Sequence, residues 1–267
     1  MDMLQTGWLV GQGVVLLCAK IALTMTVTVL VQHLALELLA GCGLLERSGD
    51  VPVKPLQTGE VGRYFKNMGL SFVTFSLQVV VSRHLEGAAS HWRTDSPNVL
   101  ELVAYSVVVL VLSDMSFYFG HRWLHSVERS HGLARTFSKW LHATPHHNSL
   151  PANKGMMAID LMAVNPLETW FDVMPGYHAS YALFSALASP NWYAAVFGFW
   201  VPIMVANLGH CGYDIPLPWM VTDVLGVNPV QVHAYHHKHV NKNFGMFFCW
   251  WDKVFETYKA VNFTKAK

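Results

Sequence analysis

An apolar run from Val99 to Phe119, rich in valine and leucine, limits what this chain can fold into more than any other feature. Its two charged residues, Glu101 and Asp114, lie near its two ends, and about 20 apolar residues are enough for a helix to cross a bilayer. Charged residues make up only 13% of the chain, against roughly 25% in an ordinary soluble domain. The run is therefore predicted to span a membrane.

Other apolar segments predict further spans. Residues 7–45 are too long for one straight crossing, so they form either one tilted span near residues 21–44 or a tight hairpin. Residues 68–81 are short for a span, and residues 156–174 and 180–209 are apolar but punctuated by prolines. We expect an all-α integral membrane protein with about four or more transmembrane helices and a cytosolic histidine-rich helical cap.

The basic residues predict the orientation of these helices. Residues 46–67, 121–154 and 238–267 hold four, five and six basic residues, whereas residues 83–97 hold two. By the positive-inside rule the first three segments lie in the cytosol. An even number of crossings between residues 155 and 209, either a hairpin or none, returns the chain to that face. The net charge of +1 excludes the electrostatic footprint of a nucleic-acid-binding protein.

Histidine is the anomalous residue type, because the chain has 15 histidines against 17 acidic residues. His121 and His125 share one helical face as an i, i+4 pair, so both imidazoles can bind one ion. In the second cluster Pro145 is expected to break the helix. The adjacent His146 and His147 then diverge and serve two neighbouring ions, or one ion and its surroundings. The residues of the second cluster are His142, His146 and His147.

The third cluster contains His233, His236 and His237, and His210 follows the last apolar run and faces the same space. Eight or more neutral imidazoles exceed the needs of a single ion, so two ions are implied. Imidazole suits zinc, copper, iron and nickel. The one Glu-x-x-His string, from Glu128 to His131, is interpreted as incidental.

The order of these motifs is similar to that of the fatty acid hydroxylase superfamily, over roughly residues 98–258. That superfamily contains sterol desaturases, C-4 methylsterol oxidases, sphingolipid and fatty acid hydroxylases and alkylglycerol monooxygenase. The matching motifs are Asp114-x-x-x-Tyr118-x-x-His121-Arg-x-x-His125, His146-His147, His233-x-x-His236-His237, Asn243-Phe-Gly and the segment from Trp251-Asp252 to Tyr258.

The resemblance implies an integral membrane enzyme of the endoplasmic reticulum, with residues 98–258 as the catalytic region of a single domain spanning residues 1–267. Such an enzyme holds two iron ions outside haem, uses O2, and hydroxylates or desaturates a lipid C–H bond. The implied iron ligands are His121, His125, His142, His146, His147, His210, His233, His236 and His237. Carboxylates and a phenol that accept the other ring N–H would orient them, namely Asp114, Tyr118, Asp214 and Asp252.

Electrons are expected from a separate protein, such as cytochrome b5 or a reductase, because the chain has no fused haem domain and no GxGxxG motif. Phe244, Phe247, Phe248, Trp250 and Trp251 line the lipid entrance or form an aromatic belt at the membrane interface.

Two departures from the family pattern keep other functions open. The second box is HxxxHH instead of HxxHH, which places His142 in doubt, and Asn165 replaces histidine in an H-P-x-E segment that ends at Glu168. His239 lies beyond the third box and is a weaker candidate ligand. The alternatives are a metal-binding membrane scaffold without oxygenase activity and a metal transporter, which would hold its ligands at mid-bilayer depth.

Overall fold

The computed structural model describes the part of the chain that carries the histidine clusters. The described residues are 23–24, 26–47, 62, 92–147, 165, 167–187, 189–215, 217, 220–228 and 230–261. The expected apolar segment at 68–81, the N-terminal part of 7–45 and most of 156–174 therefore lie outside the described residues.

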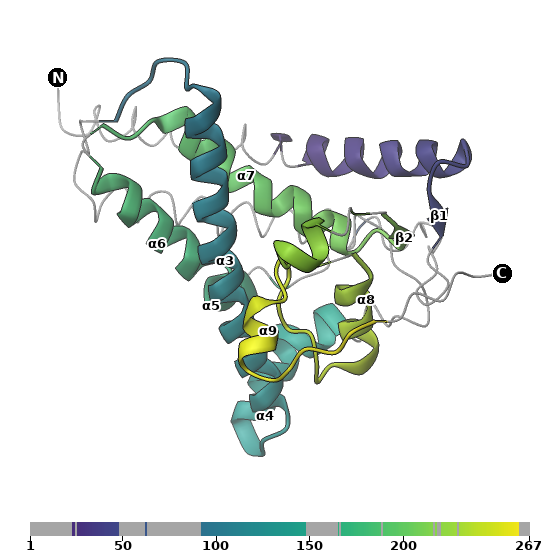
Figure 1. Cartoon of the computed structure of the whole chain (residues 1–267). Helices are drawn as coiled ribbons and strands as arrows, with labels where there is room; N and C mark the ends of the chain where they lie inside the picture. The colour runs from purple at the N-terminus through teal and green to yellow at the C-terminus, as the bar shows by residue number, and fades with distance from the viewer. Residues whose placement is uncertain are drawn as a thin grey trace.

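The described residues form mostly helices (Figure 1). A helix at Thr26–Gly41 comes first and carries no label in Figure 1. The elements that follow are β1 (Glu46–Arg47), α3 (Val99–Glu128), α4 (Gly132–Ser138), the π-helix η1 (Lys139–His147), α5 (Glu168–Asp172), α6 (Met174–Ser185), α7 (Trp192–Gly209), β2 (Tyr213–Asp214), the π-helix η4 (Met220–Val224), α8 (Val230–His239) and α9 (Trp250–Val254). The antiparallel pair β1–β2 is the one departure from an all-α fold among the described residues.

Helix α3 begins at a capping box. The Asn98 side chain accepts a hydrogen bond from the Glu101 amide at 2.9 Å, and the Glu101 side chain accepts one from the Asn98 amide at 3.0 Å. These bonds satisfy two amides that the first helical turn leaves without partners. The helix continues past Phe119 to Glu128, so the first histidine cluster lies on the same rod as the predicted span.

Two described helices, α3 and α7, are long and apolar enough to cross a membrane. In their most apolar windows only 22% and 33% of the residues are buried. Val99, Leu100 and Val103 of α3 are 75%, 75% and 53% exposed, and such a continuous apolar surface is unfavourable in water. The other spans that we expect are not tested by these residues.

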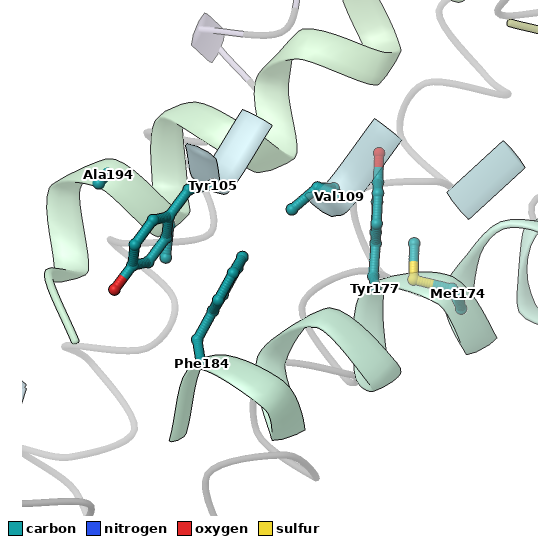
Figure 2. Packing of buried hydrophobic residues seen from close by; sticks show 7 residues of the cluster. Tyr105, Val109, Met174, Tyr177, Phe184 and Ala194 are labelled. Atoms are coloured by element: carbon teal, nitrogen blue, oxygen red, sulfur yellow. The ribbon is translucent and has the colours of Figure 1, made fainter. Parts of the chain in front are cut away.

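Aromatic side chains fill the space between α3, α6 and α7 (Figure 2). The rings of Tyr105 and Phe184 stack with their centroids 4.1 Å apart, and Val109 lies between Phe184 and Tyr177 in the same view. The Tyr105 hydroxyl also accepts a hydrogen bond from the Asn191 amide that precedes α7, at 2.9 Å. Each buried side chain of this size contributes about 1.5–3 kcal/mol.

Close packing of α5 and α6 on α3 depends on glycine at two positions. A Cβ added at Gly176 would lie 2.3 Å from the Leu112 carbonyl oxygen, and one at Gly120 would lie 2.7 Å from the Asp172 Cα. From Asp172 beside Gly120 to Phe184 beside Tyr105, the chain therefore runs antiparallel to α3, toward the N-terminal end of that helix. In α7 it runs back in the direction of α3. Helices α6 and α7 form a helical hairpin against α3, and α6, with 12 residues, is too short to be a candidate span, so the expected number of crossings stays a prediction.

Replacing Gly176 with alanine should push α6 away from α3, because the new methyl group meets backbone atoms that cannot rotate aside. Overpacking of this kind costs about 1–3 kcal/mol. We expect Gly176→Ala to lower the midpoint of thermal unfolding of the detergent-solubilised protein. Gly41→Ala is the matched control, since nothing lies within 4 Å of its added Cβ. Equal midpoints for the two variants would contradict this packing.

Candidate metal centre

Eight buried histidines form two neighbouring groups. The nitrogen atoms that each group offers lie within 4.8 Å of one another. The first group contains His121, His125, His147 and His236, and the second contains His146, His210, His233 and His237. The structure thus brings together eight of the nine ligands implied by the resemblance, and the ninth, His142, lies against the first group.

Helical geometry explains how adjacent histidines are divided between the groups. Successive residues on a helix point about 100° apart, whereas residues i and i+4 share a face. On α8, His233 and His237 therefore face the second group, while the adjacent His236 faces the first. His146 and His147 divide in the same way, as expected if each serves a different ion.

The second cluster lies on the π-helix η1, and the expectation that Pro145 would break the helix was wrong. A π-helix bonds residue i to i+5, so each turn holds one residue more than an α-helical turn. This wider turn absorbs the extra residue of the HxxxHH spacing. The His142 ring remains 4.7 Å from the His147 ring and 5.4 Å from the His146 ring, centroid to centroid.

Backbone carbonyls determine the tautomers of three imidazoles. The Nδ1 atoms of His121, His210 and His236 lie 3.2, 2.9 and 2.8 Å from the carbonyl oxygens of residues 244, 206 and 242, respectively. A carbonyl can only accept, so each Nδ1 must carry the hydrogen and each Nε2 must present a lone pair. An ionised Glu168 would have the same effect on His142, whose Nδ1 lies 2.6 Å from Oε1 of the carboxyl group.

Three imidazole nitrogens converge on Nε2 of His125. Nε2 of His121, His142 and His147 lie 3.1, 3.0 and 3.0 Å from it. One ring nitrogen provides one hydrogen or one lone pair, so at most one of these three approaches can be a hydrogen bond. In the second group, His233 Nε2 lies 3.1 Å from Nε2 of both His210 and His237. The lone pairs of the remaining nitrogens repel one another at these distances. A cation bound between them would attract each lone pair instead.

The separations fit ligands of a transition-metal ion. Imidazole nitrogen lies about 2.0–2.1 Å from such an ion, and two ligands at a right angle are then separated by about 3 Å. The Nε2 separations of 3.0–3.1 Å in both groups match that spacing. The donor set, all imidazole, is suited to iron, zinc, copper or nickel.

Burial keeps the imidazoles neutral. It lowers the pKa of six cluster histidines well below the ordinary value of about 6.5, and the neighbouring imidazoles lower each pKa further. Neutral imidazole is the form that binds metal ions. The histidines concerned are His142, His146, His147, His233, His236 and His237.

Two of the predicted orienting groups act on backbone instead of on imidazoles. Asp252 accepts hydrogen bonds from the backbone amides of residues 244 and 245, at 2.9 and 2.8 Å. Asp114 accepts from the amides of residues 246 and 247, at 3.0 and 2.6 Å. The two carboxylates thus hold four consecutive amides. Since the carbonyl of residue 244 bonds to His121, both aspartates support that imidazole through the loop.

The other two predicted orienting groups also have different partners. The Tyr118 hydroxyl accepts a hydrogen bond from Arg122 at 2.8 Å and lies 2.9 Å from the Thr257 hydroxyl. Asp214 of β2 accepts a hydrogen bond from the Gln231 side chain of α8 at 2.6 Å.

Several sequence candidates lie away from the two groups. His239 is exposed and packs on the Tyr235 ring, and His131 is exposed as the N-cap of α4. The Glu-x-x-His string is therefore not a ligand pair, although a Glu128 oxygen lies 3.6 Å from His125 Nδ1. Of the aromatic group, Phe244 is 2% and Phe247 6% exposed, so neither lies on the surface.

Sequence reasoning missed the carboxylate that bonds to His142 and the three carbonyls. Glu168 was visible as the last residue of the H-P-x-E-like segment, but nothing in the pattern linked it to the second histidine box. The carbonyls of residues 206, 242 and 244 leave no trace in the sequence, because every residue has one.

Removal of either adjacent histidine of η1 should affect a different ion position. His146→Ala and His147→Ala are each expected to weaken the binding of a different one of the two ions and so to lower the bound metal, because each removes one imidazole from a different group. Metal content of the purified variants, measured by mass spectrometry, checks this. His239→Ala, an exposed histidine in neither group, should retain both ions. Loss of the same ion in both variants, as judged from their spectra, would contradict the division.

The lowered pKa values of the buried histidines predict an acid-sensitive metal-free protein. Below about pH 6.5 the unfolded chain binds protons that the folded chain excludes, so stability is present above that pH and is lost as the pH falls. We expect the unfolding midpoint in chelator to drop steeply between about pH 7 and pH 5. A midpoint that is constant over this range would show that the imidazoles are not buried neutral.

The comparisons with known proteins agree with this geometry. The family model described as fatty acid hydroxylase matches residues 106–257, which include every histidine of both groups. The chain is 28% identical over 175 residues to cholesterol 25-hydroxylase-like protein 1, member 2 from Danio rerio, covering 64% of this chain and 56% of that protein.

Two further relatives are similar over the same region. Identity is 30% over 165 residues to methylsterol monooxygenase 1 from Danio rerio, covering 60% of this chain and 49% of that protein. Identity is 24% over 173 residues to Delta(7)-sterol 5(6)-desaturase erg3B from Aspergillus fumigatus, covering 63% of this chain and 43% of that protein. The matches thus span about half the length of these relatives, and no solved structure matches the chain. The match to the family model covers more than half of the 267 residues, and the chain therefore belongs to the fatty acid hydroxylase family.

Proposed function

We propose that the chain is a membrane oxidoreductase that holds two iron ions and uses O2 to hydroxylate or desaturate a C–H bond of a membrane lipid. The observation that carries the proposal is the convergence of three imidazole nitrogens within 3.1 Å of His125 Nε2, in a group that is wholly buried. Family membership supports iron and oxygen over the other ions that imidazole binds.

The chain's own residues would bind the two ions at adjoining positions. One ion would be held by the first histidine group with His142, and the other by the second group. When bound, the irons supply reduction of O2 and oxidation of an alkyl carbon. The surrounding protein orients the imidazoles through residues 206, 242 and 244 and excludes bulk water by burying every ligand.

An apolar wall favours an alkyl substrate. Phe117 on α3 and Ala206 on α7 pack with Met246 and Phe247, each one exposed by less than 10%. The Phe117 ring lies 4.7 Å from the His121 ring, so the wall reaches the first histidine group. Polar groups brought here would lose their hydration without compensation, whereas a hydrocarbon chain would not. The relatives named for cholesterol, methylsterol and sterol reactions favour a sterol or another long-chain lipid.

Helix ends at the centre support a membrane-boundary position. His121 and His125 lie in the last turns of α3, and His210 is the C-cap of α7, so two candidate spans reach the histidine groups with the same end. This argues against a transporter, whose ligands would lie at mid-bilayer depth. Together with the distribution of basic residues, this position favours a multi-pass protein of the endoplasmic reticulum whose histidines face the cytosol. On that face a separate protein can supply the electrons.

The scaffold alternative rested on the irregular second box. Because η1 absorbs the extra residue, His146 and His147 still join different groups, and the irregularity gives no reason to expect an inactive site.

The double variant His236→Ala/His237→Ala removes one imidazole from each group and should lose most bound iron. Lipid profiles of cells that express wild type, the double variant or His239→Ala as a control would reveal the substrate. We expect an oxidised lipid with wild type and the control only. Full iron content and unchanged lipid oxidation in the double variant would refute the proposed function.

A further inference from the structure

One carboxylate contacts the imidazoles of the centre directly through a short bond. Oε1 of Glu168 lies 2.6 Å from Nδ1 of His142, and the two residues are 3% and 0% exposed. Neutral N–H···O bonds are usually about 2.9–3.0 Å long, and bonds to an ionised acceptor are shorter. The pair therefore has the geometry of an imidazole N–H that donates to a carboxylate.

The fold brings Glu168 to this place at a cost. Helix α5 can approach α3 closely because Gly120 has no side chain, and Asp172, one turn after Glu168, lies directly against that glycine. A buried carboxylate is unfavourable unless it is paired. The bond to His142 is one compensating contact for this buried group, and Asp172 is a second close neighbour of its carboxyl group.

The bond determines which nitrogen of His142 faces the first histidine group. With the hydrogen on Nδ1, Nε2 presents its lone pair, and this atom lies 3.0 Å from His125 Nε2. The His142 ring also lies 4.7 Å from the His121 ring and 4.7 Å from the His147 ring. His142 thus joins the four imidazoles of the first group as a fifth.

The second group has no comparable support among the described residues. The carbonyl of residue 206 accepts from His210, whereas Nδ1 of His146, His233 and His237 has no hydrogen-bond partner among the described residues. Within the first group His121 and His236 are also held by carbonyls, and Glu128 lies 3.6 Å from His125, beyond hydrogen-bond length. A carboxylate makes the imidazole that donates to it more electron-rich than a carbonyl does.

We propose that Glu168 is a positioning residue that fixes His142 as the fifth imidazole of the first histidine group. The two ion positions are then unequal, with five imidazoles at one and four at the other. This inference rests on the two-ion centre of the proposed function, but not on its substrate or reaction. The four-imidazole position has the smaller ligand set of the two.

Cobalt(II) titration of the metal-free protein tests the role of Glu168 without any turnover. Glu168→Gln keeps the size of the side chain but removes its charge. Loss of a partner of this kind typically weakens metal binding about 10- to 100-fold. We expect wild type to bind two cobalt ions, and Glu168→Gln to weaken one of them by that factor and change its visible absorption, while the other ion is unaffected.

The control is Glu101→Gln, which neutralises an acid in the first turn of α3, at the opposite end of that helix from His121 and His125. It should leave both cobalt affinities and the spectrum unchanged. In a His142→Ala background, Glu168→Gln should add no further effect, because its partner is already absent. Glu168→Asp, which keeps the charge, should retain more of the wild-type spectrum than Glu168→Gln, and it also serves if Glu168→Gln does not fold.

Unchanged binding in Glu168→Gln, equal weakening of both ions, or the same loss in Glu101→Gln would overturn the assignment of Glu168. Those outcomes leave the proposed function intact, provided that wild type binds two ions. Wild type that binds two cobalt ions but oxidises no lipid would refute the proposed function and leave the assignment standing. Wild type that binds no cobalt would refute both.

Discussion

Mutual repulsion of imidazole lone pairs is the constraint on which the rest of this structure depends. Nitrogens that cannot all hydrogen-bond to one another lie 3.0–3.1 Å apart in a space closed to water. Removing neutral polar groups from water without partners costs roughly 1–3 kcal/mol each, so several such groups together are comparable with the net stability of a whole domain. Folding of this region is therefore expected to be coupled to ion binding, as it is at structural metal sites.

The surrounding elements hold the imidazoles against that repulsion. Two helices, α3 and α7, deliver histidines at their C-terminal ends, and α5 and α6 lock onto α3 where glycine replaces a side chain. Residues 244–247 are held by two buried aspartates that accept all four of their amides. Hydrogen bonds to ionised acceptors contribute about 1.5–3 kcal/mol each, so these four bonds stabilise the loop.

Sequence reasoning succeeded where a helix converts spacing into direction. The i, i+4 spacing of His121 and His125 predicted a shared face, and the adjacency of His146 and His147 predicted that they diverge. The interpretation of Pro145 as a helix breaker failed because it assumed an α-helix, in which proline also removes an i to i−4 bond. A π-helix has a different bonding pattern, and no simple residue pattern announces it.

The roles of the acidic residues were less predictable for a different reason. Asp114 and Asp252 were expected to accept from imidazoles, whereas they accept from backbone amides. A carboxylate accepts equally well from either donor, and only the tertiary fold decides between them. Glu168 lies 26 residues after His142 in the chain, across residues 148–164, which the structure does not describe. Contacts across such a separation have no local signature.

The division of labour between backbone and side chains suggests why the two ion positions differ. Backbone carbonyls orient two imidazoles of the first group and one of the second, so each group has at least one ligand that the backbone holds in place. The carboxylate at His142 and the extra imidazole both fall on the first group. A centre with one firmly held position and one position with fewer ligands separates two tasks, anchoring an ion and leaving space for a reactant, that a symmetric pair of sites would have to combine.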